Sequence, residues 1–286
     1  MYPAQFEYHK AGTVKEAVDL LAKYKDEAKL LAGGHSLLPA MKLRLAQPKH
    51  LIDIGKVSGL AGVKEEGGTL VIGAMTTHYA IESSAVLKSK CPLLPEVAGH
   101  IGDPMVRNMG TLGGSLAHAD PAADWPAAVI ALGAELVAEG PKGKRTIKVD
   151  DFFKGLLTTA LAEDEILTEI RVPACGANVK CAYAKFPHPA SRFAVVGVAA
   201  VLTLDGGKIS KASIGITGAG TKATRAKGVE AAIAGKPADA VSIQAAASSA
   251  AEGVDVQADL QGSVEYKQHL LRVFAKRAME AAAAKK

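Results

Sequence analysis

Two glycine pairs, each followed at once by polar side chains, constrain this chain more than any other feature. The first lies in Gly33-Gly34-His35-Ser36, directly after a short apolar segment, and the second in Gly113-Gly114-Ser115. Glycine lets a backbone approach a ligand without an intervening Cβ, and successive N–H groups in such a turn can converge into an anion-binding nest. An apolar segment able to begin a helix follows each pair, and a helix N-terminus favours a phosphate.

This pattern has two interpretations. A glycine pair is by itself most often only a turn, because glycine is the default turn residue. Two such pairs, with the hydroxyls of Ser36, Thr111 and Ser115 and with Arg107 close by, instead indicate a site for a dinucleotide diphosphate. No P-loop motif and no dinucleotide fingerprint after the first strand offers a competing nucleotide site. The glycines of residues 215–220 end a predicted strand and need no ligand to explain them.

The order of predicted elements indicates an α+β fold. Thr13 and Glu16 have the spacing of a capping box ahead of a helix that begins at Val14, in a first region that reads β-α-β. Strands are predicted at 28–31, 50–54, 60–63, 69–73, 134–138, 145–149 and 165–172, and helices at 37–45, 77–88, 93–101 and 126–132. An antiparallel hairpin at 193–204 and 208–217 and then alanine-rich helices complete the chain.

A stretch near 174–179 separates two predicted domains. Pro173, Gly176 and Asn178 punctuate it, and the hairpin begins beyond it. We therefore predict a first domain at 1–176, with parts at about 1–54 and 55–176, and a second domain at 177–286.

Composition argues against several functions. The net charge of +5 is mild and spread along the chain, and one Trp, six Tyr and six Phe offer little base stacking, so nucleic-acid binding has little support. No signal-peptide pattern and no apolar run of roughly 18 residues occurs, so we expect a cytoplasmic protein that is not integral to a membrane.

Metal binding also has little support in the sequence. Cys91, Cys175 and Cys181 form no CxxC pair, which argues against a zinc site or an iron–sulfur cluster and favours structural thiols. The histidines show no metal-ligand spacing, so no metal ligand is predicted in this chain.

Three phrases, Leu30 to Pro39, Ile72 to His78 and Arg107 to Ser115, together resemble one family. They are similar to segments of the FAD-binding medium subunits of molybdenum hydroxylases of the carbon monoxide dehydrogenase type, and the similarity runs over nearly the whole chain. The resemblance implies a two-part FAD-binding domain of the vanillyl-alcohol-oxidase (PCMH) type. A small C-terminal domain of antiparallel sheet plus helices would follow it and pack over the flavin.

The resemblance also implies which residues contact FAD. The two pyrophosphate loops would be Ala32, Gly33, Gly34, His35 and Ser36, and Thr111, Leu112, Gly113, Gly114 and Ser115. Asp124 matches a residue that holds the ribityl chain, although in the first turn of a helix it could equally serve the helix dipole. Lys185 and Leu167 match residues that line the isoalloxazine and its pyrimidine end, and Phe193 matches an aromatic beside the ring.

Two positions depart from the family pattern. Ser115 stands where the second loop usually ends in Asn, and Arg192 stands where an acidic residue commonly precedes the flavin-side aromatic. Both departures leave cofactor binding intact and bear on the redox potential of the flavin.

The implied function is electron transfer in a complex. A large molybdenum-binding subunit would oxidise the substrate at Mo-pterin, a small subunit would carry [2Fe–2S] centres, and non-covalent FAD in this chain would pass electrons to an external acceptor. The expected assembly is a dimer of heterotrimers, and no catalytic residue is predicted here. One alternative is a self-contained oxidase of the same fold with flavin attached to His35, and another is a non-enzymatic nucleotide-binding scaffold.

Overall fold

The N-terminal residues form a parallel sheet of three strands in the order β1-β3-β2, in a computed structural model that describes residues 1–285. Thr13 caps helix α1 by accepting from the Glu16 N–H at 3.1 Å. The Glu16 carboxylate accepts from the Gly12 N–H, so the predicted capping arrangement is confirmed with Glu16 reaching one residue further back. The elements are β1 (Glu7–Lys10), α1 (Val14–Tyr24), η1 (Lys25–Glu27), β2 (Ala28–Leu31), α2 (Leu37–Lys42) and β3 (His50–Asp53).

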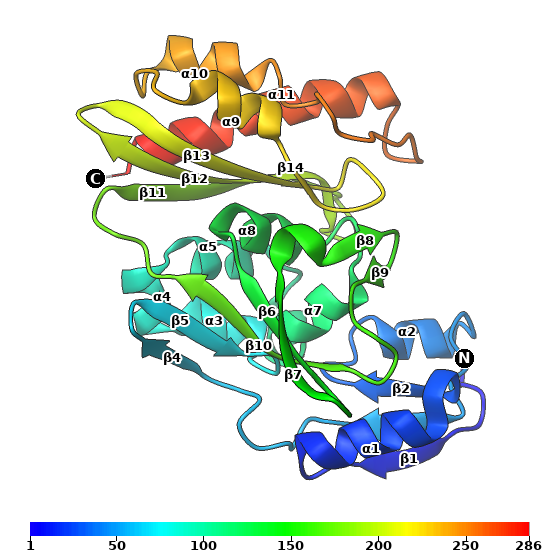
Figure 1. Cartoon of the computed structure of the whole chain (residues 1–286). Coiled ribbons are helices and arrows are strands. Elements are labelled where there is room, and N and C mark those ends of the chain that lie inside the picture. Colours follow the sequence, from blue (N-terminus) through cyan, green and yellow to red (C-terminus); the bar gives the residue numbers. More distant parts are fainter. Residues whose placement is uncertain (286) are drawn as a thin grey trace.

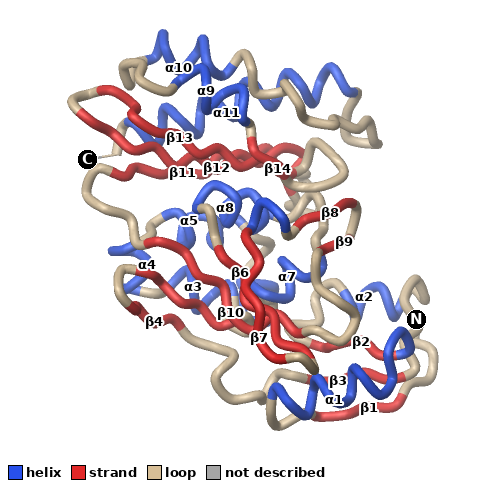
Figure 2. Tube along the Cα trace, viewed as in Figure 1, coloured by secondary structure: helices blue, strands red, loops and turns tan. Residues whose placement is uncertain are grey.

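A five-stranded antiparallel sheet, β4-β5-β10-β6-β7, forms the middle of the molecule with six helices beside it (Figure 2). All nine residues of α8 are buried, because this helix lies between the middle sheet and the C-terminal sheet (Figure 1). The elements are β4 (Val63–Glu66), β5 (Thr69–Gly73), α3 (His78–Ser83), α4 (Ala85–Lys90), α5 (Leu93–His100), α6 (Pro104–Met109), α7 (Leu112–His118), α8 (Asp124–Leu132), β6 (Glu135–Gly140), β7 (Gly143–Lys148), η2 (Val149–Asp151), β8 (Phe153–Gly155), β9 (Thr158–Thr159) and β10 (Ile166–Pro173).

The C-terminal part is an antiparallel sheet, β11-β12-β13-β14, with α9, α10 and α11 on its outer face and α8 against its inner face (Figure 1). Gly215 in β13 allows this close packing, because a Cβ there would overlap the carbonyl of Ala127 in α8. Packing against α8 therefore accounts for the glycine at this position, as the sequence, which required no ligand to explain it, allows. The elements are β11 (Val179–Pro187), β12 (Ala194–Asp205), β13 (Lys208–Thr217), β14 (Thr224–Arg225), α9 (Lys227–Ile233), α10 (Ala240–Ala247) and α11 (Val264–Ala283).

The predicted α+β class is confirmed, but the elements predicted between residues 77 and 118 were wrong in detail. The helix predicted at 77–88 is broken at Ser84, whose hydroxyl caps α4 by accepting from the Leu87 N–H. The glycine-rich turn predicted before Ser115 is instead two helices, α6 and α7, capped by Asp103 and Thr111. Strand β4 starts at residue 63 rather than 60, since Leu60 is buried and its carbonyl accepts from the Met75 N–H.

Two further sequence expectations concern the membrane and the thiols. Within residues 1–285, no helix is both long and apolar enough to cross a bilayer. The three cysteines are free, and Cys91 and Cys181 are buried. A hydrogen bond to Cys175 and burial raise the pKa of the Cys181 thiol, which keeps it protonated and unreactive.

Candidate functional site

The first glycine loop, residues 32–36, connects β2 to α2 and leaves several of its backbone amides unpaired. Gly34 has φ +74°, in the left-handed region that favours glycine. The N–H groups of Gly33, Gly34, His35 and Ser36 have no acceptor in the part of the chain that the structure describes. Ser36 precedes α2 but its hydroxyl does not cap the helix. Four successive amides and a hydroxyl are therefore available to phosphate oxygens.

His35 has a structural role within this loop. Its Nδ1 lies 2.9 Å from the Gly33 carbonyl, which fixes Nδ1 as the protonated nitrogen and leaves Nε2 free.

The second glycine pair lies inside α7 and is differently used. The Thr111 hydroxyl accepts from the Gly114 N–H at 3.1 Å, while the Leu112 and Gly113 N–H groups donate to the carbonyls of Thr76 and Ala74. Leu112 is fully buried in the core. The expectation that this pair presents converging amides is therefore wrong, because these amides anchor α7 to the strand end at 74–76.

The two loops nevertheless form one continuous surface. A Cβ on Gly33 would overlap the Met109 carbonyl, and a Cβ on Gly114 would lie 3.4 Å from the Cβ of Ala32 and 2.7 Å from the Thr111 hydroxyl. Both loops thus carry glycine partly because they pack on each other. The structure brings together the predicted residues 32–36 and 111–115, which are about 80 positions apart in the chain.

His78, which was not predicted as a site residue, contacts the segment just before the second glycine pair. It is buried, its N–H donates to the Gly110 carbonyl, and its Nδ1 accepts from the Trp125 indole at 3.0 Å. Burial, with smaller contributions from His35 and Arg107, lowers the pKa of His78 to about 4. His78 is therefore neutral at pH 7 and serves as a hydrogen-bond partner for Trp125.

This burial predicts a pH-dependent stability. The pKa of His78 rises to its ordinary value of 6.5 on unfolding, so the stabilisation is complete above pH 6.5 and is lost as pH falls through about 4. The full effect is about 3 kcal/mol. Between pH 7.5 and pH 4, the free energy of unfolding measured with urea should fall by about 3 kcal/mol less in His78→Gln than in the wild type. The exposed control His118→Gln should follow the wild type. Equal slopes for wild type and His78→Gln would contradict the assignment.

Asp124 and Lys185 meet at a buried junction between α8 and β11. The Lys185 ammonium lies 2.8 Å from Asp124 Oδ2 and also donates to the His100 carbonyl at 3.0 Å. The Tyr183 hydroxyl donates to Asp124 Oδ1 at 2.5 Å. Burial raises the pKa of Asp124, against the opposing effects of Lys185 and Tyr183, and burial and the Asp124 charge raise that of Tyr183. Asp124 makes no capping hydrogen bond in α8, and Tyr183 was not foreseen from the sequence.

The remaining candidate residues are Leu167, Phe193 and Arg107. The Leu167 side chain is buried in the core, and the neighbouring Thr168 carbonyl accepts from Ala74, which in turn accepts from Gly113. Phe193 is 42% exposed beside the segment that leads into α8, since Ala194 donates to the Ala122 carbonyl. Arg107 does not add free charge to the loops, because its guanidinium is paired with Glu82 at 2.8 Å and donates to the Ile101 carbonyl.

A loop of unpaired amides between a strand and a helix can bind an anion such as a phosphate group. Comparison with known proteins identifies the family of the chain. Residues 4–175 match the family described as the FAD binding domain in molybdopterin dehydrogenase, and residues 181–282 match the CO dehydrogenase flavoprotein C-terminal domain.

Individual relatives cover the same length. The carbon monoxide dehydrogenase medium chain of Hydrogenophaga pseudoflava is 45% identical, over 99% of this chain and 98% of the relative. The nicotine 6-hydroxylase medium subunit of Paenarthrobacter nicotinovorans is 35% identical, over 97% of both chains. A solved structure of carbon monoxide dehydrogenase from H. pseudoflava that lacks the Mo-pyranopterin moiety of its molybdenum cofactor superposes with a TM-score of 0.97 over 99% of both chains, at 47% identity.

The chain therefore belongs to the family of FAD-binding medium subunits of molybdenum hydroxylases. It is a subunit of an oxidoreductase, with an FAD-binding domain and a C-terminal flavoprotein domain. The predicted family, fold and cofactor are confirmed.

Proposed function

We propose that this chain binds FAD non-covalently and transfers electrons from [2Fe–2S] centres of a partner subunit to an external acceptor. The observation that carries the proposal is the row of four unpaired amides from Gly33 to Ser36, in a chain whose family binds FAD. These amides and the Ser36 hydroxyl suit a pyrophosphate, because each offers a directed donor to an anionic oxygen. FAD supplies the electron-carrying chemistry when bound.

The other predicted residues contribute in two ways. Thr111 to Ser115 support the first loop from behind, with the Ser115 hydroxyl as a further donor to the pyrophosphate. Asp124 and Lys185 would hold the ribityl and isoalloxazine parts, with Leu167 at the pyrimidine end and Phe193 beside the ring. These roles rest on the family resemblance. The ion pair between Asp124 and Lys185 fixes both side chains at the domain junction, where the Lys185 side chain is 2% and the Asp124 side chain 5% exposed.

The partners follow from the kind of complex to which the relatives belong. The relatives are named as medium chains or subunits, and the description of one solved relative mentions a molybdenum cofactor. We propose a large molybdenum-binding subunit and a small [2Fe–2S] subunit, assembled in the cytoplasm as a dimer of heterotrimers. Exposed apolar side chains near the glycine loops lie on α2, directly after α2 and on α6, and support an interface there, namely those of Leu38, Leu43, Leu45, Met105 and Met109.

The substrate is set elsewhere in this proposal. The relatives named for carbon monoxide and for nicotine both match almost the whole of this chain. One flavoprotein framework therefore accompanies different oxidation chemistries.

Purification at native expression level tests the proposal. We expect a yellow complex containing iron, molybdenum and two further polypeptides, from which acid releases FAD, while the denatured mass of this chain remains unmodified. A mass increased by one FAD at His35, together with oxidase activity of the isolated chain, would establish the self-contained oxidase instead. A folded, colourless chain without affinity for FAD would refute both.

A further inference from the structure

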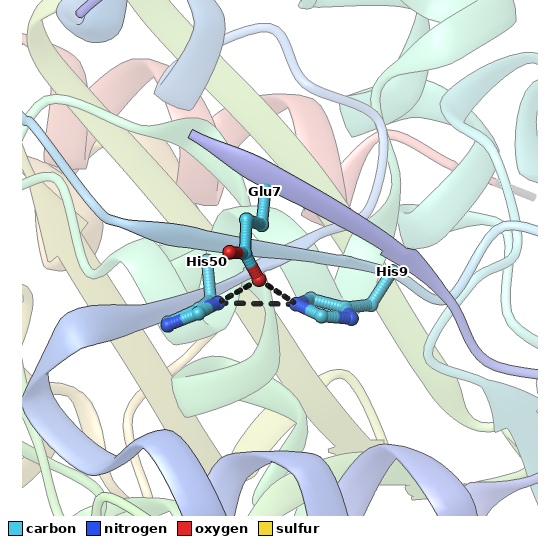
Figure 3. A group of neighbouring side chains, drawn as sticks. All are labelled: Glu7, His9 and His50. Atoms are coloured by element: carbon cyan, nitrogen blue, oxygen red, sulfur yellow. Dashed lines mark hydrogen bonds and ion pairs between the residues drawn. The ribbon is translucent and has the colours of Figure 1, made fainter. Parts of the chain in front are cut away.

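Three potential metal ligands gather at the start of the small parallel sheet, and none of them is among the residues considered above. Glu7 and His9 alternate along β1 and therefore point to the same face, and Glu7 pairs in register with His50 of β3. Figure 3 shows the three side chains converging. Residues 9 and 50 are separated by 41 positions, so only the pairing of β1 with β3 brings these imidazoles together.

The separations of the three ligand atoms suit a single ion. His9 Nε2 lies 3.1 Å from His50 Nδ1, and Glu7 Oε2 lies 3.4 Å from His50 Nδ1 and 3.9 Å from His9 Nε2. Ligands at about 2.0–2.1 Å from a tetrahedral Zn²⁺ are about 3.4 Å apart, so the two imidazoles would separate by a few tenths of an ångström and the Glu7 carboxylate would approach His9. The Glu7 side chain is 72% exposed and is free to do so.

The surroundings restrict the imidazoles and engage the neighbouring cations. The Tyr24 ring stacks on His50 with centroids 3.6 Å apart, and the His9 and His50 side chains are 22% and 13% exposed. Two neighbouring charged side chains, those of Glu27 and Lys49, form an ion pair with each other. The Lys23 ammonium lies over the Tyr24 ring, 4.7 Å from the ring centroid.

We propose that Glu7, His9 and His50 bind one divalent transition-metal ion of the Zn²⁺ class, with water at the remaining position. Two imidazoles and a carboxylate are typical ligands of Zn²⁺, and they leave the fourth position open. In the metal-free chain, a hydrogen bond between the two imidazole nitrogens takes the place of the ion. From the sequence we expected no metal ligand in this chain, because the spacing of the histidines carries no signal.

The proposed ligands precede the FAD loop along the strand direction. Glu7 and His50 begin their strands and His9 lies in the row of Leu30, whereas residues 32–36 follow the last residue of β2, so the ligand residues lie roughly 7–13 Å from the loop along the strands. The ion would therefore tie β1 to β3 without contacting the cofactor. This separation allows the metal site and the FAD site to be tested independently.

The test is metal titration of the tag-free, full-length chain after treatment with EDTA. We expect calorimetry to show one equivalent of Zn²⁺ and Co²⁺ to give the visible absorption of a tetrahedral site without the intense near-ultraviolet band of thiolate ligands. Glu7→Gln should weaken Zn²⁺ binding at least about tenfold, and the double variant His9→Gln/His50→Gln should abolish it. The exposed His269→Gln, in α11, is the matched control and should bind as the wild type does.

Folding is checked separately by circular dichroism, and the exposed Glu7→Gln change keeps the test valid if the double variant misfolds. FAD content should be the same with and without Zn²⁺. No stoichiometric binding to the wild type, unchanged binding by a folded Glu7→Gln variant, or a thiolate band with Co²⁺ would each overturn the proposal. None of these results depends on whether FAD occupies its own site.

Discussion

Replacing Gly34 by valine is expected to abolish FAD retention. A β-branched residue at φ +74° is strained by about 1–3 kcal/mol. In addition, its Cβ would lie 2.9 Å from Leu38 Cδ1 and 3.3 Å from Leu31 Cδ1, so these side chains must move, and relief of the backbone strain would shift the loop. Because the four unpaired amides belong to this loop, a shift displaces these donors from the phosphate oxygens that they are proposed to bind. The ratio of flavin to protein absorbance in the purified chain should fall from near one equivalent to less than about a tenth of that.

Two variants separate loss of the loop conformation from general damage. Gly235 has φ +75° and no atom within 4 Å of the position of its Cβ, so Gly235→Val introduces comparable backbone strain in the C-terminal part and should keep its FAD. Ser36→Ala should be milder than Gly34→Val, since it removes one hydrogen bond to a charged group, worth about 1–3 kcal/mol. Full flavin occupancy in Gly34→Val, or equal loss in Gly235→Val, would disprove the assignment of the loop.

Substitution in the second glycine pair is expected to impair FAD retention for a different reason. A Cβ on Gly114 would lie 2.7 Å from the Thr111 hydroxyl that caps α7, so Gly114→Val should disturb the cap and also the contact with Ala32. We therefore expect Gly114→Val to lose FAD through displacement of the supporting loop rather than of a donor.

The first loop could be predicted from sequence because all its signals are local. An apolar strand, a glycine pair and a helix follow one another within fifteen residues, and each is specified by its own side chains. The second loop could not be distinguished from the first by composition. The Leu112 and Gly113 amides donate to the carbonyls of Thr76 and Ala74, and that pairing depends on the approach of a segment far away in the sequence. The helix start at Asp103 and Pro104 carried a local signal, an N-cap residue followed by proline, that was missed.

Long-range contacts account for the other omissions. Tyr183 donates to Asp124 across 59 positions, and the hydroxyl has room only because residue 197 on the neighbouring strand is glycine, where a Cβ would overlap it. Neither residue has a distinctive local pattern. Buried polar groups of this kind become visible only when the register of β11 and β12 is known.

Breaking the junction between Asp124 and Lys185 is expected to have the largest effect on stability. Both side chains are almost completely buried, so Lys185→Met leaves the Asp124 carboxylate with only the Tyr183 hydroxyl, and Asp124→Asn leaves a buried ammonium. Removing one partner of a buried pair costs about 3–5 kcal/mol. In a chain of this size that corresponds to a fall in Tm of roughly 10 °C, measurable by differential scanning calorimetry.

A double-variant cycle shows whether the pair acts as a unit. Asp124→Asn with Lys185→Met removes both charges, so its loss of stability should be smaller than the sum of the two single losses, by at least about 1 kcal/mol. Lys15 and Asp19 provide the matched exposed pair, 82% and 62% exposed, and Lys15→Met should change the free energy of unfolding by less than about 0.5 kcal/mol. Additive losses, or single variants no less stable than Lys15→Met, would show that the contact does not hold α8 to β11. Because the same two residues are proposed to face the flavin, the cycle is run on the apo chain as well. A coupling that survives without FAD belongs to the domain junction, and any additional coupling in the holo chain measures their contact with the cofactor.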